Sequence, residues 1–168
     1  VLAQMKRKVT VEEFLERVGW LRQNDPEFAL STDLIVGFPG ESEEQFQQTL
    51  ELIKKVRFSF VFAFKYSPRK NTPASRYQDQ LSEVDKTRRL AELNRIQDHI
   101  TLELNQSQIG QEKSILITYQ SKKEADTYYG RTDCFRLVKV RSKHDISSQT
   151  VPAKIIEANK TALIAELL

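Results

Sequence analysis

The feature that most constrains this fold is an apolar run followed by an unusual loop and a helix, a pattern that occurs twice. Residues 33–41 read D-L-I-V-G-F-P-G-E, and residues 58–74 read F-S-F-V-F-A-F-K-Y-S-P-R-K-N-T-P-A. Leu30 to Phe38 is mainly apolar, which predicts a strand buried on both faces. Phe58 to Tyr66 alternates at period two, which predicts a second strand. With a helix between them they form a βαβ unit with parallel strands, whose following loops are where α/β proteins bind ligands.

Three helices are predicted from end signals and helical spacing of apolar residues. Capping boxes start the first two, over about residues 10–23 and 42–56, and a third helix runs from Ser82 to about residue 107. The capping boxes are Thr10 with Glu13 and Ser42 with Gln45. Two parallel strands make too small a sheet, so we expect the missing strands upstream or in another chain.

Composition indicates a globular protein. The 168 residues are 39% hydrophobic and 29% charged, and no apolar run reaches the length of a membrane span. The N-terminus shows neither a signal peptide nor an initiator Met, so we expect a fragment of a cytoplasmic protein. Cys134 is the single cysteine and cannot form an internal disulfide, which fits a reducing compartment.

The sequence pattern changes near residue 109 from helical spacing of apolar residues to short β-like runs. This change predicts two domains, 1–108 and 109–168. The second part consists of short β-like runs separated by turns, which favours a small antiparallel barrel. The runs are Lys113–Tyr119, Tyr128–Gly130, Phe135–Val140, Thr150–Ala158 and Thr161–Ala165. It carries 10 Lys and Arg against 7 Asp and Glu, whereas residues 1–108 carry 16 of each. This excess points to a polyanion such as nucleic acid, or to a merely solvated surface.

Cations and aromatics alternate in the predicted barrel. The candidate RNA-binding residues are Lys122, Lys123, Arg131, Arg136, Lys139 and Arg141, with Lys143 also in the series. Tyr128, Tyr129 and Phe135 lie between them. Aromatic rings stack on unpaired bases while cations meet phosphates, which is the chemistry of single-stranded RNA binding. The alternative places the rings in the barrel core and leaves the cations as solubilising charge.

The two strand-end loops are candidate binding loops. Gly37 would let an adenine or ribose lie against the first strand, with Asp33 nearby, or it would simply serve a tight turn. Arg69 offers a planar fork for a carboxylate or phosphate, or belongs to an ordinary surface loop. His99 and His144 lack partners at metal-ligand spacing, so no metal site is predicted. Trp20 is expected to pack in the interior.

Five segments together resemble the methylthiotransferases of the radical S-adenosylmethionine superfamily. They are M-K-R-K-V-T (5–10), D-L-I-V-G-F-P-G-E (33–41), Y-S-P-R-K-N-T-P-A (66–74), R-L-A-E-L (89–93) and G-R-T-D (130–133). The resemblance implies an α/β fold, the C-terminal part of a partial (β/α) radical barrel, followed by a small antiparallel β-barrel called TRAM that binds RNA. It implies S-adenosylmethionine and two 4Fe-4S clusters as cofactors of the full-length enzyme.

The resemblance also assigns residues and a substrate. Ile35 and Gly37 match the family motif that borders the adenine of S-adenosylmethionine, and the backbone near Tyr66 would contact the same adenine. Arg7 and Arg69 match characteristic positions without an assigned role. The segment G-R-T (130–132), followed by Arg136 and Val138, resembles the MiaB type, which modifies isopentenyl-adenosine beside the tRNA anticodon. The branch that modifies threonylcarbamoyl-adenosine remains open.

The cysteines that hold the family's clusters are absent from this chain. We therefore expect a fragment that is inactive alone, holds one wall of the cofactor pocket and binds the tRNA anticodon stem-loop. Its partner would be the missing N-terminal half of the same polypeptide. The alternative is a stand-alone RNA-binding protein whose α/β portion is only structural.

Overall fold

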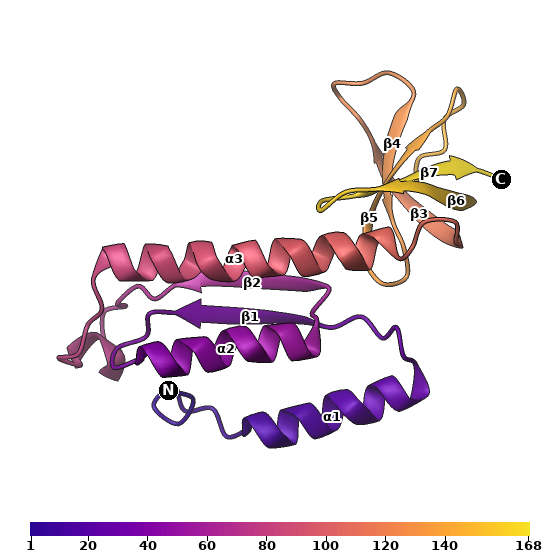
Figure 1. Cartoon of the computed structure of the whole chain (residues 1–168). Coiled ribbons are helices and arrows are strands. Elements are labelled where there is room, and N and C mark those ends of the chain that lie inside the picture. The colour runs from indigo at the N-terminus through magenta and orange to yellow at the C-terminus, as the bar shows by residue number, and fades with distance from the viewer. The chain divides into compact units, whose positions relative to one another are not determined.

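A computed structural model describes the whole chain, residues 1–168, which divides into two compact units, Val1–Ile100 and Thr101–Leu168. Figure 1 labels the elements of both units. The first unit holds α1 (Val11–Asn24), β1 (Ser31–Val36), α2 (Glu43–Val56), β2 (Phe60–Lys65), a short 3-10 helix (Pro73–Arg76) and most of α3 (Glu83–Gln106). No helix combines the length and the hydrophobicity that a membrane span requires.

The predicted βαβ unit is confirmed. β1 and β2 form a parallel two-stranded sheet whose register runs from Ser31 opposite Phe60 to Val36 opposite Lys65. Both strands are shorter than the apolar runs that predicted them, since the flanking residues enter the turns. Beyond β2, the Tyr66 N–H donates to the Val36 carbonyl at 2.9 Å, which extends the pairing by one residue.

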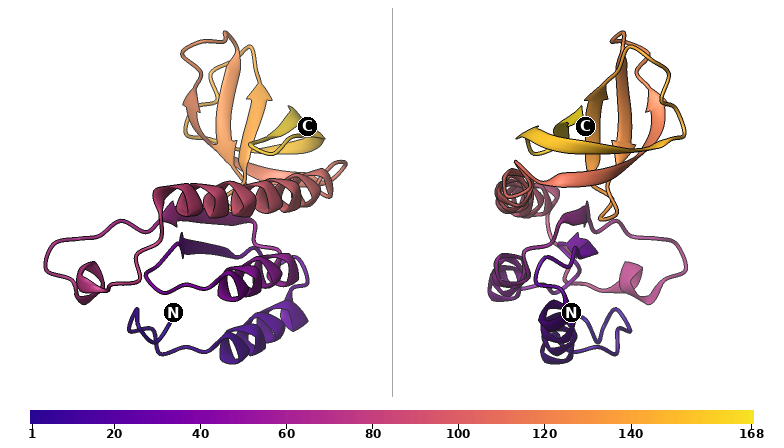
Figure 2. Two further views of the ribbon diagram at one scale, coloured as in Figure 1. Left: turned by 60° about the vertical axis from the view of Figure 1, so that its left-hand side comes forward. Right: turned by 90° about the vertical axis from the view of Figure 1, so that its right-hand side faces the viewer.

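Helices cover only one face of this sheet. Figure 2 shows α2 and α3 on the same side of β1 and β2 in its right-hand view. The apolar stripe predicted for α2 is buried there, together with Leu93 and Ile100 of α3. The stripe consists of Phe46, Leu50, Ile53 and Val56. The prediction that β1 is buried on both faces is wrong, because Asp33 and Ile35 on its other face are exposed, Ile35 by 45%.

The capping boxes form as predicted. In the first, the Glu13 N–H donates to Thr10 Oγ1 at 3.2 Å and the Thr10 N–H donates to Glu13 Oε2 at 3.0 Å. Ser42 and Gln45 repeat this arrangement at the start of α2. Trp20 was expected in the interior but is 65% exposed. Val18 is the buried residue of α1, and a residue two positions further along a helix points away from it.

The second unit is a closed barrel of five strands in the order β3-β4-β5-β7-β6. The strands are β3 (Glu112–Gln120), β4 (Thr127–Arg131), β5 (Leu137–Arg141), β6 (Thr150–Ala158) and β7 (Leu163–Leu167). Four pairs are antiparallel, as predicted, but β5 and β7 are parallel. A ring with an odd number of strands cannot alternate direction all the way round, so at least one pair must be parallel.

The last turn of α3 belongs to the barrel unit. Asn105 Nδ2 donates to the Asn159 carbonyl at 2.7 Å, and Asn105 Oδ1 accepts from Arg136 Nη1 at 2.6 Å. The compact units divide between Ile100 and Thr101, within α3, and the domain bounds 1–108 and 109–168 stay a prediction.

Candidate functional site

The uncovered face of the β1–β2 sheet is the first candidate surface. Asp33 pairs with Phe62 and Ile35 pairs with Phe64, so these four side chains share one face. Phe62 and Phe64 are 57% and 54% exposed. The patch is therefore largely apolar with one carboxylate, at the strand ends where α/β proteins hold ligands. It brings together two of the predicted cofactor residues, Asp33 and Ile35.

Gly37, the third predicted cofactor residue, is explained by close packing. Its φ is +72°, and a Cβ placed there would lie 2.5 Å from Lys86 Cγ. The Lys86 side chain is buried, with Nζ 3.0 Å from Glu83 Oε1 and 5.7 Å from the ring centroid of Tyr66. Lys86 thus fills the space that a larger residue at position 37 would need. The close packing and the positive φ both favour glycine at position 37, and its predicted contact with S-adenosylmethionine stays a prediction.

A buried ion pair fixes the loop between β1 and α2. Glu41 Oε2 accepts from the Gly37 N–H at 2.7 Å and from Arg89 Nη1 at 2.6 Å. Both side chains are buried, and the Arg89 guanidinium lies 5.2 Å from the ring centroid of Phe46. The pair ties the loop to α3. Sequence reasoning missed it, although a carboxylate directly after the loop G-F-P-G (37–40) is a possible acceptor for loop N–H groups.

Tyr66 directly follows β2 at the end of the sheet, and Arg69 lies further along the loop after β2. The Tyr66 ring meets Phe38 edge to face at 5.2 Å, and its hydroxyl is buried without a hydrogen-bond partner. Arg69 is exposed on the following loop, where Asn71 has a positive φ of 69°, which asparagine tolerates better than most residues. A role for Arg69 in the cofactor site stays a prediction.

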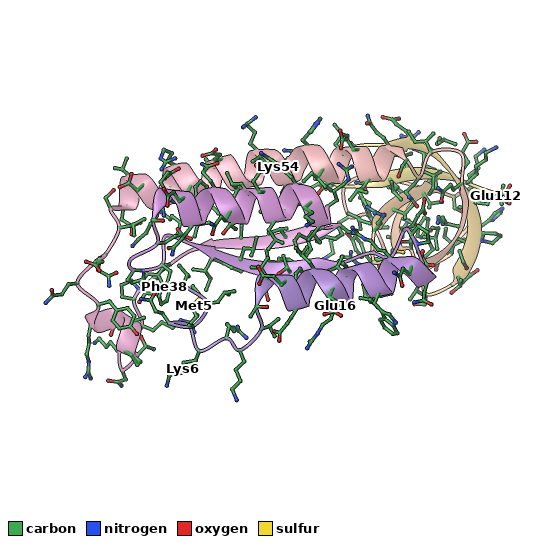
Figure 3. All side chains as sticks on the ribbon, turned by 60° about the horizontal axis from the view of Figure 1, so that its bottom comes forward. Met5, Lys6, Glu16, Phe38, Lys54 and Glu112 are labelled. Atoms are coloured by element: carbon green, nitrogen blue, oxygen red, sulfur yellow. The ribbon has the colours of Figure 1, made fainter.

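A polar cleft of about 480 Å³ lies beside this loop. It is lined by Gln4, Pro39, Arg76, Tyr77, Gln78 and Asp79. Figure 3 shows Met5 and Phe38 next to each other, and the presence of Gln4 and Pro39 in one lining confirms that the two segments are neighbours. The N-terminal turn, which carries the first of the five motif segments, therefore lies against the loop that carries the second.

The outer face of the barrel is the second candidate surface. Leu116, Arg131 and Leu137 form one row across β3, β4 and β5, because each is the register partner of the next. A neighbouring row brings Tyr119 onto Tyr129, with ring centroids 5.3 Å apart and planes 24° apart. Tyr128, in contrast, is 3% exposed and belongs to the barrel core. Tyr119 is a surface aromatic that sequence reasoning did not include.

The six predicted RNA-binding cations differ in their environments. Lys122, Lys123, Arg131 and Arg141 are exposed. Lys139 Nζ lies 2.6 Å from Glu124 Oε2, and this hydrogen bond lowers the pKa of Glu124. Arg136 is 6% exposed and its guanidinium donates to Asn105, which favours a structural role for this side chain over an RNA contact. A buried arginine between polar turn residues gives no local sequence signal that separates it from a surface one.

No three His, Cys, Asp or Glu side chains gather in a way that could hold a metal ion. Cys134 is half-buried, and burial with the neighbouring Asp133 carboxylate raises the pKa of its thiol. The residues of this chain therefore offer apolar, aromatic and cationic contacts rather than metal ligands.

Comparison with known proteins identifies relatives along the whole chain, although no model of a protein family matches it. The chain is 41% identical over 168 residues to the tRNA-2-methylthio-N(6)-dimethylallyladenosine synthase of Syntrophobacter fumaroxidans, covering 37% of that protein. Proteins of the same name from Symbiobacterium thermophilum and Methylacidiphilum infernorum are 37% and 43% identical over 168 and 157 residues, and the chain covers 36% and 34% of them.

The chain thus spans about a third of the length of these curated relatives. The matches include both compact units, so the similarity does not rest on one module alone. The chain is therefore similar over nearly its whole length to the C-terminal part of these synthases.

Proposed function

We propose that this chain is part of an enzyme that adds a methylthio group to N(6)-dimethylallyladenosine in tRNA. The observation that carries the proposal is 41% identity across all 168 residues to a synthase of that name. A stand-alone RNA-binding protein with a structural α/β portion would not need this similarity in both units. The proposed substrate is the adenosine beside the anticodon of tRNA.

The first unit is proposed to be the C-terminal part of a (β/α) radical barrel. Its sheet has two strands and one uncovered apolar face, and such sheets need further strands and a covered second face. The N-terminal part of the same polypeptide would supply those strands. The face with Asp33, Ile35, Phe62 and Phe64 would then line the barrel interior.

The residues present fit the adenine of S-adenosylmethionine at the strand ends. Ile35 and Phe64 offer a flat apolar wall, and the carboxylate of Asp33 on the same face can accept hydrogen bonds. Gly37 and Tyr66 would shape the end of the wall through the backbone, while Arg69 stands further out on the loop. When bound, S-adenosylmethionine and two 4Fe-4S clusters would supply the methyl group and the radical chemistry. Ligands for the clusters would come from outside this chain, which we expect to be inactive by itself.

The second unit is proposed to be a TRAM barrel that binds the tRNA anticodon stem-loop. The exposed Lys122, Lys123, Arg131 and Arg141 would meet phosphates, and the stacked pair Tyr119 and Tyr129 would lie beside them. Lys139 is proposed as a weaker contributor, because Glu124 already neutralises it. An enzyme acting on tRNA would work in the cytoplasm.

Nucleoside analysis tests the proposed function. Cells that lack the gene encoding this chain should lose 2-methylthio-N(6)-dimethylallyladenosine from their tRNA and accumulate the form without the methylthio group. Loss of a methylthiolated threonylcarbamoyl-adenosine instead would assign the chain to the other tRNA branch.

A further inference from the structure

Phe135 combines two unfavourable features at one position of the barrel. Its φ is +61°, in the left-handed region that a bulky side chain rarely adopts, and its side chain is 72% exposed. Among the six non-glycine residues with positive φ it is the only aromatic one. Neither the backbone strain nor the exposure of the ring helps the fold, and strain of this kind is typical of functional sites.

The loop around Phe135 is held by hydrogen bonds at both ends. The Phe135 N–H donates to the Thr132 carbonyl at 3.0 Å, and the Thr132 N–H donates to the Arg136 carbonyl at 3.1 Å. The Arg136 N–H donates to Thr132 Oγ1 at 3.2 Å, while the Arg136 side chain is anchored on Asn105. Thr132 and Arg136 are both 6% exposed. The loop thus presents the Phe135 ring from a fixed base.

A guanidinium is fixed on the backbone of Phe135. Arg131 Nη1 donates to the Phe135 carbonyl at 2.8 Å, which leaves the other N–H groups of the exposed side chain able to bind a phosphate. Arg131 also belongs to the row with Leu116 and Leu137, next to the row with the stacked Tyr119 and Tyr129. Phe135 therefore stands at one end of a surface that alternates rings and cations.

We propose that Phe135 stacks on an unpaired base of the bound RNA while Arg131 contacts an adjacent phosphate. The inference rests on the proposed function and names the contact that holds the single-stranded part of the substrate. A lone ring beside a fixed cation suits a splayed nucleotide, which has a flat face and a charged backbone. A protein partner would instead favour an apolar pocket around the ring, whereas the immediate neighbours here are Arg131 and the exposed Asp133.

Substituting Phe135 separates stacking from folding. Phe135→Asn removes the ring and relieves the strain, because Asn adopts positive φ readily, so the unfolding midpoint should rise. Affinity for a fluorescent RNA stem-loop should nevertheless fall by about tenfold, the usual value of one base–aromatic stack. Affinity for a fully paired RNA duplex should not change, since its bases cannot splay out. Phe135→Tyr keeps the ring and should keep the affinity.

Ser148→Asn is the matched control. Ser148 lies in another loop of the barrel unit with φ +60°, so the substitution relieves similar strain without removing a ring, and RNA affinity should not change. Wild-type chain that binds no stem-loop at all would contradict the proposed function, and this inference with it. Wild-type binding with unchanged affinity in Phe135→Asn would overturn the stacking contact alone.

Discussion

Replacing Gly37 by Ala tests the packing between the first strand loop and α3. Two costs add at this position. The positive φ of +72° costs a non-glycine residue about 1–2 kcal/mol. The new Cβ would also stand 2.5 Å from Lys86 Cγ, an atom in the middle of a buried side chain, and overpacking of this kind costs about 1–3 kcal/mol. We expect Gly37→Ala to lower the free energy of unfolding by about 2–5 kcal/mol.

Gly40 provides a matched control in the same loop. Its φ is +77°, but its nearest atom to a new Cβ is Asp79 Oδ2 at 3.9 Å, an ordinary contact. Gly40→Ala should therefore lower the free energy of unfolding only by the cost of the positive φ, about 1–2 kcal/mol. In a double variant, Lys86→Ala should recover part of the loss caused by Gly37→Ala, because removing the Lys86 side chain makes room for the Cβ.

Urea unfolding followed by far-ultraviolet circular dichroism measures these differences, because the helices lie mainly in the first unit. The single variants Gly37→Ala, Gly40→Ala and Lys86→Ala, the double variant and the wild-type chain should be compared at one pH and salt concentration. Equal losses for Gly37→Ala and Gly40→Ala, or strictly additive losses with Lys86→Ala, would refute the proposed contact between Gly37 and Lys86.

Two further predictions concern charges. The hydrogen bond from Arg88, with one from Gln47, lowers the pKa of Glu43 from 4.5 to about 2, so its stabilising contribution is present above about pH 5 and is lost as the pH falls toward 2. Because Glu43 is half-exposed, Glu43→Gln should lower the free energy of unfolding by at most about 1 kcal/mol at neutral pH and have no effect near pH 2, measured by urea unfolding. The double variant Arg131→Gln with Arg141→Gln should weaken stem-loop binding and reduce the slope of log affinity against log salt by about 1 to 2. Lys154→Gln on β6 serves as the control for that slope, and an unchanged slope in the double variant would remove these two arginines from the RNA interface.

Local signals predicted most of the elements. The capping side chains of Thr10 and Ser42 contact groups within three residues, and the apolar stripe of α2 follows helical spacing. The capping boxes and the stripe can therefore be predicted without the tertiary structure. The runs that predicted β3 to β7 also overlap the observed strands, since alternation depends only on which face is buried. These features depend on neighbours in sequence, and that is why the sequence alone indicated them.

The missed features depend on residues far apart in the chain. The burial of Arg136 requires Asn105, and the burial of Glu41 requires Arg89, so neither follows from a local pattern. The parallel pairing of β5 with β7 follows from closing a ring of five strands, which the sequence did not specify. The exposure of Ile35 depends on what covers the sheet rather than on the strand itself. For the candidate site, the sequence predicted which residue types are present but not which of their side chains are exposed.

The central claim, that this chain serves tRNA methylthiolation, is tested most directly by the modified nucleosides of the source organism. Total tRNA from wild-type cells, from cells lacking the gene and from complemented cells should be digested and quantified by mass spectrometry. We predict that 2-methylthio-N(6)-dimethylallyladenosine disappears without the gene, that N(6)-dimethylallyladenosine rises correspondingly, and that complementation restores the ratio. Unchanged levels of every methylthiolated adenosine in the deletion strain would contradict the account.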